Sequence, residues 1–455
     1  MKIQKTYLFL MLLVVVSACK TGTTNQIVVS ADTVENQKLI DFSPNTLSDK
    51  YTSYNTGLKK WDIEHPSNIM NLGKGYSIRA PQDYSTTERS IFEGAFKGIP
   101  NNGKIEFNLV STGLFSLIGN PYPSAIDADL FLNANESKTY GALYFWTHNT
   151  PISNFKYSSD DYAVYNFIGG VSTKAKSASE EETAPNGKIA SGQAFFIRSN
   201  SSETIEFNNS MRIAGQNNIF FKPAKTADLQ FKKHRLWLNL TNKKGVFKQI
   251  LIGYVNTDLK SDIQYDAESI NGNQYADFYS LFENKKLVIK GQTAPFQNSD
   301  IIPLGYRIAE ADNLTISIDR ADGEMNTKEV YLYDKLKEVT HNLRLNDYFF
   351  NSEAGTFLDR FEIHFQNKTL AYSDFDIITD EVLVSLKDRI IDLKALKENL
   401  KEVYIFDLNG QLLYEKRNLN LSKLHIPDLN SMDQLVLVKI VLQNNHLTTK
   451  KIIFN

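Results

Sequence analysis

Val403-Tyr-Ile-Phe-Asp-Leu-Asn-Gly-Gln-Leu-Leu-Tyr414 is the stretch that best defines the fold of this chain. Two apolar runs flank Asn409-Gly410, and an Asn-Gly pair supplies the positive φ angles that a tight β-hairpin turn needs. Further along, residues 435–442 form an apolar, β-branched run, and residues 448–454 can return beside it as a last strand. We therefore predict a small Ig-like β-sandwich of about seven strands in residues 377–455.

The same strand signature continues upstream through the body of the chain. Short apolar, aromatic or β-branched runs are bounded by Asn, Asp, Gly and Pro, at residues 104–110, 141–146, 193–198, 203–207 and 314–319. Few windows carry the 3.6-residue apolar repeat of a helix. The sequence predicts an all-β fold of tandem β-sandwich domains, with a first domain at 51–222 that contains a mobile loop at 172–188, a second domain at 234–366, and the C-terminal sandwich.

Composition limits the classes of protein to which this chain can belong. Its 455 residues are enough for about three domains, and the 42% apolar share is too high for a disordered chain. The 50 basic and 52 acidic residues nearly cancel, so the basic excess of a nucleic-acid-binding protein is absent. The single cysteine excludes an intramolecular disulfide and a cysteine-rich zinc site.

The N-terminus has the features of an export signal. Two lysines precede residues 6–18, an uncharged and mostly apolar run that is too short to span a membrane. Its end, Val-Ser-Ala-Cys at 16–19, resembles the bacterial lipoprotein signal, which implies a lipid on Cys19. The alternative is ordinary signal-peptide cleavage just before that cysteine. We predict a signal peptide with a lipobox at residues 1–19 and a flexible, polar tether at residues 20–50.

The C-terminal stretch also resembles a known export signal. Residues 403–414, the Val-Ser-Leu-Lys-Asp-Arg-Ile run at 384–390 and the terminal Lys450-Lys451 are similar to the C-terminal sorting domain of the type IX secretion system of Bacteroidota, especially its type C form. The resemblance implies that residues 377–455 are an export address, recognised by the translocon and its outer-membrane shuttle. The sorting-signal positions that it points to are Asp407, Asn409, Gly410, Lys439, Lys450 and Lys451.

The middle of the chain resembles surface proteins of the same bacteria. Residues 119–124 (Gly-Asn-Pro-Tyr-Pro-Ser), 144–148 (Tyr-Phe-Trp-Thr-His) and 237–242 (Trp-Leu-Asn-Leu-Thr-Asn) carry this resemblance. It implies a flavobacterial surface protein whose modules precede a sorting domain and have no enzymatic role.

No residue pattern points to a catalytic centre or to a cofactor. The seven histidines include no His-Glu-x-x-His, and the chain has neither a Gly-x-Ser-x-Gly elbow nor a Gly-rich phosphate loop. Asp127 and Asp129 could offer oxygen ligands to calcium, but a turn with solvated carboxylates is the simpler interpretation. We therefore expect no enzyme activity, no metal and no bound cofactor.

Aromatic side chains could still form a ligand-binding surface. Trp146 and Tyr122 are the candidate ligand contacts, because aromatic rings stack on sugars and Tyr122 lies in a Pro-Tyr-Pro turn. The competing interpretation is a buried place in a sandwich core, and it is the stronger one for each tryptophan, Trp61 and Trp237 included.

These features predict a non-enzymatic protein at the outer membrane, at the cell surface or outside the cell. Its first two domains would serve adhesion or contact with surface glycans or matrix. Besides the translocon, we expect the protein to bind no nucleic acid. We expect it to contact a membrane only through a lipid anchor. The alternatives are a carbohydrate-active enzyme or its accessory carbohydrate-binding module, and a structural lipoprotein that faces the periplasm.

Overall fold

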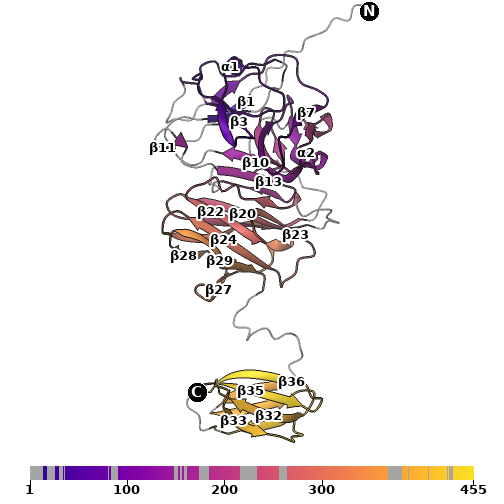
Figure 1. The fold of residues 1–455 in the computed structure, drawn as a ribbon, viewed down its shortest axis with the longest axis vertical. Coiled ribbons are helices and arrows are strands. Elements are labelled where there is room, and N and C mark those ends of the chain that lie inside the picture. Colours follow the sequence, from indigo (N-terminus) through magenta and orange to yellow (C-terminus); the bar gives the residue numbers. More distant parts are fainter. Residues whose placement is uncertain are drawn as a thin grey trace, which may run out of the picture. The chain divides into compact units, whose positions relative to one another are not determined.

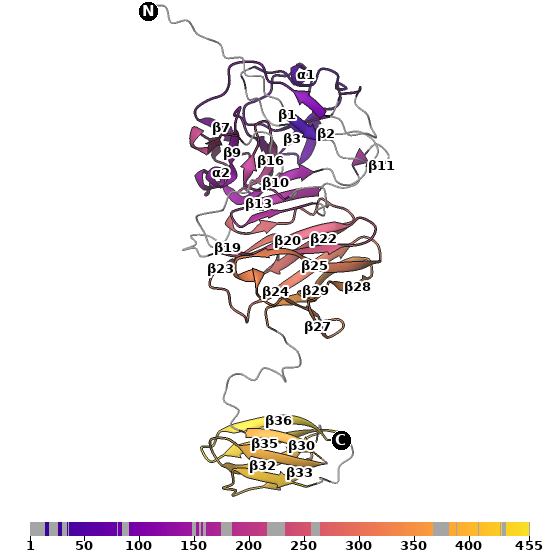
Figure 2. The same ribbon diagram turned by 180° about the vertical axis from the view of Figure 1, so that it is seen from behind.

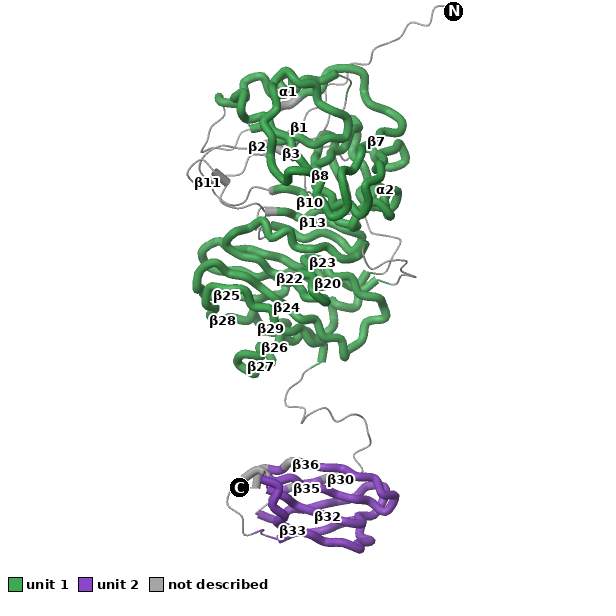
Figure 3. Tube along the Cα trace, in the orientation of Figure 1, with its two compact units in different colours: residues 1–367 green, residues 368–455 purple. Residues whose placement is uncertain are grey.

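The chain folds into two compact units, residues 1–367 and residues 368–455, which Figure 3 shows in green and purple. The computed structural model confirms the all-β prediction, since strands dominate and both α-helices among the described residues are short. The structure describes residues 14–17, 26–29, 34, 36–79, 81–83, 91–147, 152–153, 156–157, 161–173, 184–215, 233–255, 264–366, 382–387, 389–407, 409–427, 429 and 434–454.

The earlier half of the first unit contains two main sheets and several short pairs. The four-stranded sheet has the order β2 (Gln26–Val29), β5 (Tyr76–Arg79), β3 (Tyr51–Asn55), β4 (Lys60–Ile63). The five-stranded sheet has the order β14 (Gly169–Val171), β13 (Asp161–Asn166), β10 (Thr139–Thr147), β16 (Ala194–Ser199), β8 (Phe115–Gly119). The short groups are β1 (Val14–Ser17) with β6 (Ile91–Gly94), β11 (Ile152–Ser153) with β12 (Lys156–Tyr157), β17 (Thr204–Phe207) with β7 (Ile105–Asn108), and β15 (Lys188–Ile189), β9 (Ala125–Asp127), β18 (Arg212–Ile213).

The later half of the first unit is one large sheet. Its described strands run in the order β27 (Val339–Asn342), β26 (Tyr331–Asp334), β29 (Gly355–His364), β24 (Ile301–Ile308), β22 (Ala276–Phe282), β23 (Lys285–Thr293), β20 (Phe247–Val255), β19 (Lys233–Thr241), β25 (Asp312–Asp322), β28 (Tyr348–Ser352), with β21 (Ala267–Glu268) beside β23. The helices of the unit are α1 (Leu39–Phe42), α2 (Ala128–Ala134) and the 3-10 turns η1 (Asn209–Met211) and η3 (Gly323–Asn326). Neither described α-helix has the length and apolar content that crossing a membrane requires.

The five-stranded sheet is apolar on both of its faces. On β10, Leu143 and Phe145 enter the core of the earlier half, whereas Ala142 and Tyr144 join a different cluster on the other face. Successive side chains of a strand point to opposite faces, so a strand with apolar residues at every position needs a cover on both sides.

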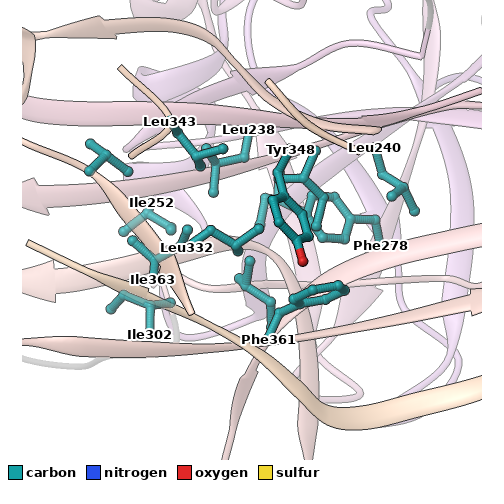
Figure 4. Packing of buried hydrophobic residues seen from close by; sticks show 14 of the residues in the cluster. Leu238, Leu240, Ile252, Phe278, Ile302, Leu332, Leu343, Tyr348, Phe361 and Ile363 are labelled. Atoms are coloured by element: carbon teal, nitrogen blue, oxygen red, sulfur yellow. The ribbon is translucent and has the colours of Figure 1, made fainter. Parts of the chain in front are cut away.

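The large sheet has the same property. Leu238 of β19 points into the core of the later half, and its neighbour Trp237 points to the other face. Figure 4 shows this core, in which Leu332 of β26 and Tyr348 of β28 come from strands near opposite ends of the sheet. Because both ends contribute to one core, the sheet curls around it instead of forming two separate layers.

The two outward apolar faces cover each other. Tyr144 of β10, Trp237 of β19 and Leu251 of β20 belong to one buried cluster, which we call the shared layer. Both ribbon views show β10 and β13 lying against the large sheet (Figures 1 and 2). The boundary predicted between 51–222 and 234–366 therefore does not separate compact units, because one apolar layer joins the two segments.

The tether predicted at 20–50 is wrong at residues 26–29, which form β2 of the four-stranded sheet, and again at residues 34 and 36–50. Val34, Leu39 and Phe42 are at most 4% exposed and form a small core with Tyr76 and other residues of the four-stranded sheet. Spaced apolar residues in a polar segment are enough to fix it to a neighbouring sheet once they are buried.

The loop predicted at 172–188 is ordered at both of its ends. The backbone N–H of Ser172 donates to Gln249 Oε1 at 2.9 Å. At the other end, Lys188 lies in β15, and its Nζ is 2.5 Å from a carboxylate oxygen of Asp127. Residues 174–183 lie outside the described residues.

The second unit confirms the predicted small sandwich. One sheet has the order β30 (Val382–Lys387), β31 (Ile390–Ala395), β34 (Lys423–Ile426), and the other has the order β33 (Leu412–Lys416), β32 (Leu400–Phe406), β35 (Gln434–Leu442), β36 (Leu447–Phe454). Both sheets contribute to one core, which includes Leu393 of β31 and Val438 of β35. The predicted hairpin is present, because β32 pairs antiparallel with β33 and Gly410 has a φ of +83°.

Candidate functional site

Tyr122 is wrong as a ligand contact. Its side chain is fully buried, and its hydroxyl donates to the Gly103 carbonyl at 2.5 Å. Burial raises the pKa of its phenol to about 12, so the group stays neutral. The Pro-Tyr-Pro turn places the ring in the core because Asn120 next to it is also buried and donates three hydrogen bonds to backbone carbonyls.

The three tryptophans differ in exposure. Trp237 is 2% exposed and lies in the shared layer, as the core interpretation predicts. Trp146 is half-buried and stands opposite Tyr162 in the β10–β13 pairing, so the two side chains point to one face of the sheet. Trp61, on the edge strand β4, is 40% exposed. Lys60 and Asp62 beside it are the sequence signal that could have identified an exposed strand.

Trp61 lies at one end of a group of neighbouring aromatic rings, which we call the aromatic row: Trp61, Tyr54, Phe196 and Tyr162. The Trp61 ring centroid lies 5.6 Å from that of Tyr54 and 6.1 Å from that of Phe196, both in edge-to-face geometry. The Tyr162 ring centroid lies 5.9 Å from that of Phe196. Such spacing is that of stabilising aromatic pairs, so the buried Phe196 ring connects Trp61 with Tyr162 in one fixed group.

Tyr162 also lines a small pocket at the seam between the five-stranded sheet and the large sheet, which we call the seam pocket. Its free volume is about 50 Å³. Val164 and Val171 of the five-stranded sheet and Val288 of the large sheet provide apolar walls. The polar residues that line it are Ser172, Thr173, Lys248, Gln249, Ser269, Asn271, Asn273 and Asp277. An apolar wall with a few convergent polar groups is the usual composition of a ligand site.

Asp277 is the buried charge of the seam pocket, at 5% exposure. Its carboxylate oxygens accept hydrogen bonds from the Ser269 hydroxyl at 2.8 and 3.0 Å. Burial raises the pKa of this carboxyl above its ordinary value, and the Ser269 hydrogen bond and the charge of Lys248 act against that rise. The positive charge of Lys248 thus favours the ionised form of Asp277 without cancelling the effect of burial on its pKa.

Arg307 holds one wall of the seam pocket in place. Its guanidinium donates to the Gln274 carbonyl at 2.8 Å and to Asn271 Oδ1 at 3.0 Å, and it also bonds the Asn273 carbonyl. Asn271 itself has a φ of +53°, a conformation that asparagine tolerates better than most residues. The wall is thus prepared before any ligand arrives, which lowers the entropic cost of binding.

The seam pocket can form hydrogen bonds with hydroxyl or amide groups. Among the described residues that line it, Asp277 carries the single carboxylate, whereas most glycoside hydrolases need a pair at a set separation. The described residues also hold no cluster of three or more metal-ligating side chains. Asp127, a calcium candidate, instead caps α2 by accepting from the backbone N–H groups of Asp129 and Leu130.

The residues that the sequence predicts as a sorting signal occupy two places in the second unit. Asp407 is 8% exposed and accepts hydrogen bonds from the backbone N–H groups of Asn409 and Gln411, so it stabilises the predicted turn. The lysines lie on β35 and β36, where Lys439 is exposed and stands opposite Thr449. Lys450 and Lys451 stand opposite Val438 and Leu437. Cys19, the predicted lipid site, lies outside the described residues.

The two units correspond to two protein families. The chain belongs to the family described as Domain of unknown function (DUF8693), whose model matches residues 22–365. A second family model, Domain of unknown function (DUF8694), matches residues 370–454. No curated protein matches the chain. The matched ranges meet where the chain passes from the first unit to the second, and the seam pocket lies within the first.

Proposed function

We propose that this chain is an exported bacterial surface protein whose second unit is a type IX sorting signal and whose first unit contacts glycans or matrix. The observation that carries the proposal is the second unit: a separate sandwich, in which the stretch resembling the sorting motif forms the β32–β33 hairpin. Two sheets with their own core support a module that a translocon can recognise independently of its cargo.

Deletion of residues 377–455 tests the sorting role. We expect the truncated protein to accumulate in the periplasm, protected from protease added to intact cells. A fusion of residues 377–455 to a periplasmic reporter with its own signal peptide is the matched control, and it should reach the surface. Normal surface display of the truncated chain would overturn the sorting role.

The first unit supports the contact role through a different feature. An exposed tryptophan, Trp61, is joined by aromatic rings to the seam pocket, whose walls carry hydroxyl, amide and charged groups. Aromatic and polar groups together are the composition that recognises polyhydroxylated ligands.

Mass spectrometry of the mature termini complements the deletion: an acylated Cys19 would show lipid anchoring, and a terminus between residues 366 and 376 would show removal of the sorting unit.

A further inference from the structure

We propose that β4 (Lys60–Ile63) pairs antiparallel with β4 of a second copy of this chain across a two-fold axis, so that two four-stranded sheets become one continuous sheet. The inference goes beyond the proposed sorting and contact roles, because it assigns the first unit a partner. It rests on the free backbone edge of β4, on the exposed apolar side chains there and on the order of charges along the strand.

The backbone of β4 has hydrogen-bonding groups that point away from its own sheet. The Glu64 N–H donates to the Tyr51 carbonyl at 2.8 Å, and in the same register Ile63 stands opposite Thr52. Hydrogen-bonded and non-hydrogen-bonded pairs alternate along an antiparallel ladder, so the N–H and C=O groups of Trp61 and Ile63 face outward. Within the described part of the chain, β4 pairs with β3 alone and no hydrogen bond reaches these groups. A strand edge of this kind is a template for a further strand.

The side chains of β4 do not protect this edge. Trp61 and Ile63 lie on one face of the strand and are 40% and 68% exposed, and Leu58 in the preceding turn is 65% exposed. Natural edge strands are often guarded by an unpaired lysine or by proline. The lysine of β4, Lys60, has its Nζ 3.2 Å from a carboxylate oxygen of Asp62, so the strand has no net charge to repel a second copy.

The order of charges selects one register for the pairing. Outward-facing groups must meet outward-facing groups, so Trp61 or Ile63 of one copy stands opposite Trp61 or Ile63 of the other. Trp61 opposite Ile63 sets Asp62 against Asp62, and Ile63 opposite Ile63 sets Asp62 against Glu64; like charges directly opposite are destabilising. Trp61 opposite Trp61 instead sets Lys60 against Asp62 on both sides of the axis and places two aromatic side chains together. Both kinds of pair stabilise antiparallel strands.

The size of the contact indicates a weak dimer. β4 contributes four residues per copy, whereas a stable interface uses roughly 20–30 residues on each side. We therefore expect dissociation in the micromolar to millimolar range, where a high density of the protein on a surface would favour the dimer. The joined sheet keeps both Trp61 side chains on one face, which is compatible with the proposed contact role.

Sedimentation equilibrium of the full chain, from roughly 1 µM to 1 mM, measures the association. Ile63→Pro removes an outward N–H and keeps the hydrogen bonds that join β4 to β3, so it should weaken dimerisation roughly tenfold or more. Ile63→Val is the matched control, because it keeps both the N–H and a β-branched side chain, and it should dimerise like the parent.

A charge reversal tests the register. Asp62→Lys sets lysine against lysine on both sides of the axis and should weaken dimerisation. Adding Lys60→Asp restores opposite charges in the reverse order and should recover most of the loss. Circular dichroism of each variant checks that the fold is kept, and the charge-reversed pair tests the proposal even if Ile63→Pro fails to fold.

Three results would overturn the pairing: a monomer at every concentration, a dimer that Ile63→Pro leaves unchanged although the variant folds, or a loss in Asp62→Lys that Lys60→Asp does not recover. A dimer that is weakened by Ile63→Pro and restored by the double charge reversal supports it. Each outcome is independent of surface display, which tests the sorting role.

Discussion

Trp237 connects the two halves of the first unit, and its substitution tests whether they unfold together. Its side chain is 2% exposed, and its Nε1–H donates across the shared layer to the Gly170 carbonyl at 2.9 Å. The guanidinium carbons of Arg235 and Arg320 lie 5.0 and 4.1 Å from the indole ring centroid. Each of these contacts depends on the indole. The hydrogen bond joins β19 of the large sheet to β14 of the five-stranded sheet.

The expected magnitudes follow from the contacts that each variant loses. Trp237→Phe removes the hydrogen bond, worth about 1 kcal/mol, and weakens two cation–π contacts worth about 0.5–1 kcal/mol each. We therefore expect the free energy of unfolding to fall by about 2 kcal/mol. Trp237→Ala also opens a cavity in the shared layer, so a fall of about 3–5 kcal/mol is expected.

Urea unfolding followed by tryptophan fluorescence measures these losses. The signal of Trp237→Phe still reports the first unit, because Trp61 and Trp146 remain and residues 368–455 contain no tryptophan. Hydrogen exchange should show protection falling in both halves of the first unit and staying unchanged in the second unit. If only residues 233–366 lost protection, the shared layer would not make the halves cooperative, and the reasoning would be refuted.

Substitutions at a buried ion pair and at a glycine test other parts of the first unit. Arg360→Met leaves the fully buried Asp334 carboxylate with the Tyr348 hydroxyl but without its cation. In urea titrations the free energy of unfolding should fall by about 3–5 kcal/mol. Adding Asp334→Leu should recover most of that loss, because no unpaired charge then stays buried. Burial alone would raise the pKa of Asp334, but hydrogen bonds from Arg360 and Tyr348 outweigh it and lower the pKa below its ordinary value. The resulting stabilisation is present above the unfolded pKa of about 3.9 and is lost as pH falls through the lower folded pKa, so the gap between parent and Asp334→Asn should narrow below about pH 4. Gly141→Ala should lower stability by about 2 kcal/mol or more in thermal denaturation, since φ is +74° and the new Cβ would lie 2.5 Å from a backbone atom. Gly113→Ala is the control. It has a φ of +80° but open space around it, so it should lower stability less.

Local patterns predicted the strands well because strand formation depends on short-range alternation. The runs at 104–110 and 314–319 became β7 and β25, and the Asn409-Gly410 turn connects β32 with β33. The helix α2 was missed because it spans seven residues, too few to show a helical repeat. Its one sequence signal is the capping aspartate before it, Asp127.

Burial of single side chains could not be predicted in the same way. Tyr122 and Trp61 both stand beside turn-forming or charged residues, yet one is fully buried and the other is 40% exposed. The difference arises from segments distant in sequence: Gly103 accepts the Tyr122 hydroxyl bond, whereas β4 forms the edge of its sheet. Alternation of apolar and polar residues indicates the two faces of a strand, but it does not indicate which distant element covers each face.

The shared layer explains why a pocket with this composition exists. Each sheet offers an apolar face to the other, and twisted sheets cannot stay in close contact over their whole width, so space remains at the seam. The strands there carry Val164 and Val288 toward the layer, while the neighbouring loop carries Asn271 and Asn273 at the rim of the pocket. The pocket therefore needs both halves of the first unit, and a fragment that ends before β19 would lack Lys248, Asp277 and the wall that Arg307 holds. A ligand that binds there would stabilise the association of the two sheets, so ligand binding and the cooperativity of the first unit should rise and fall together.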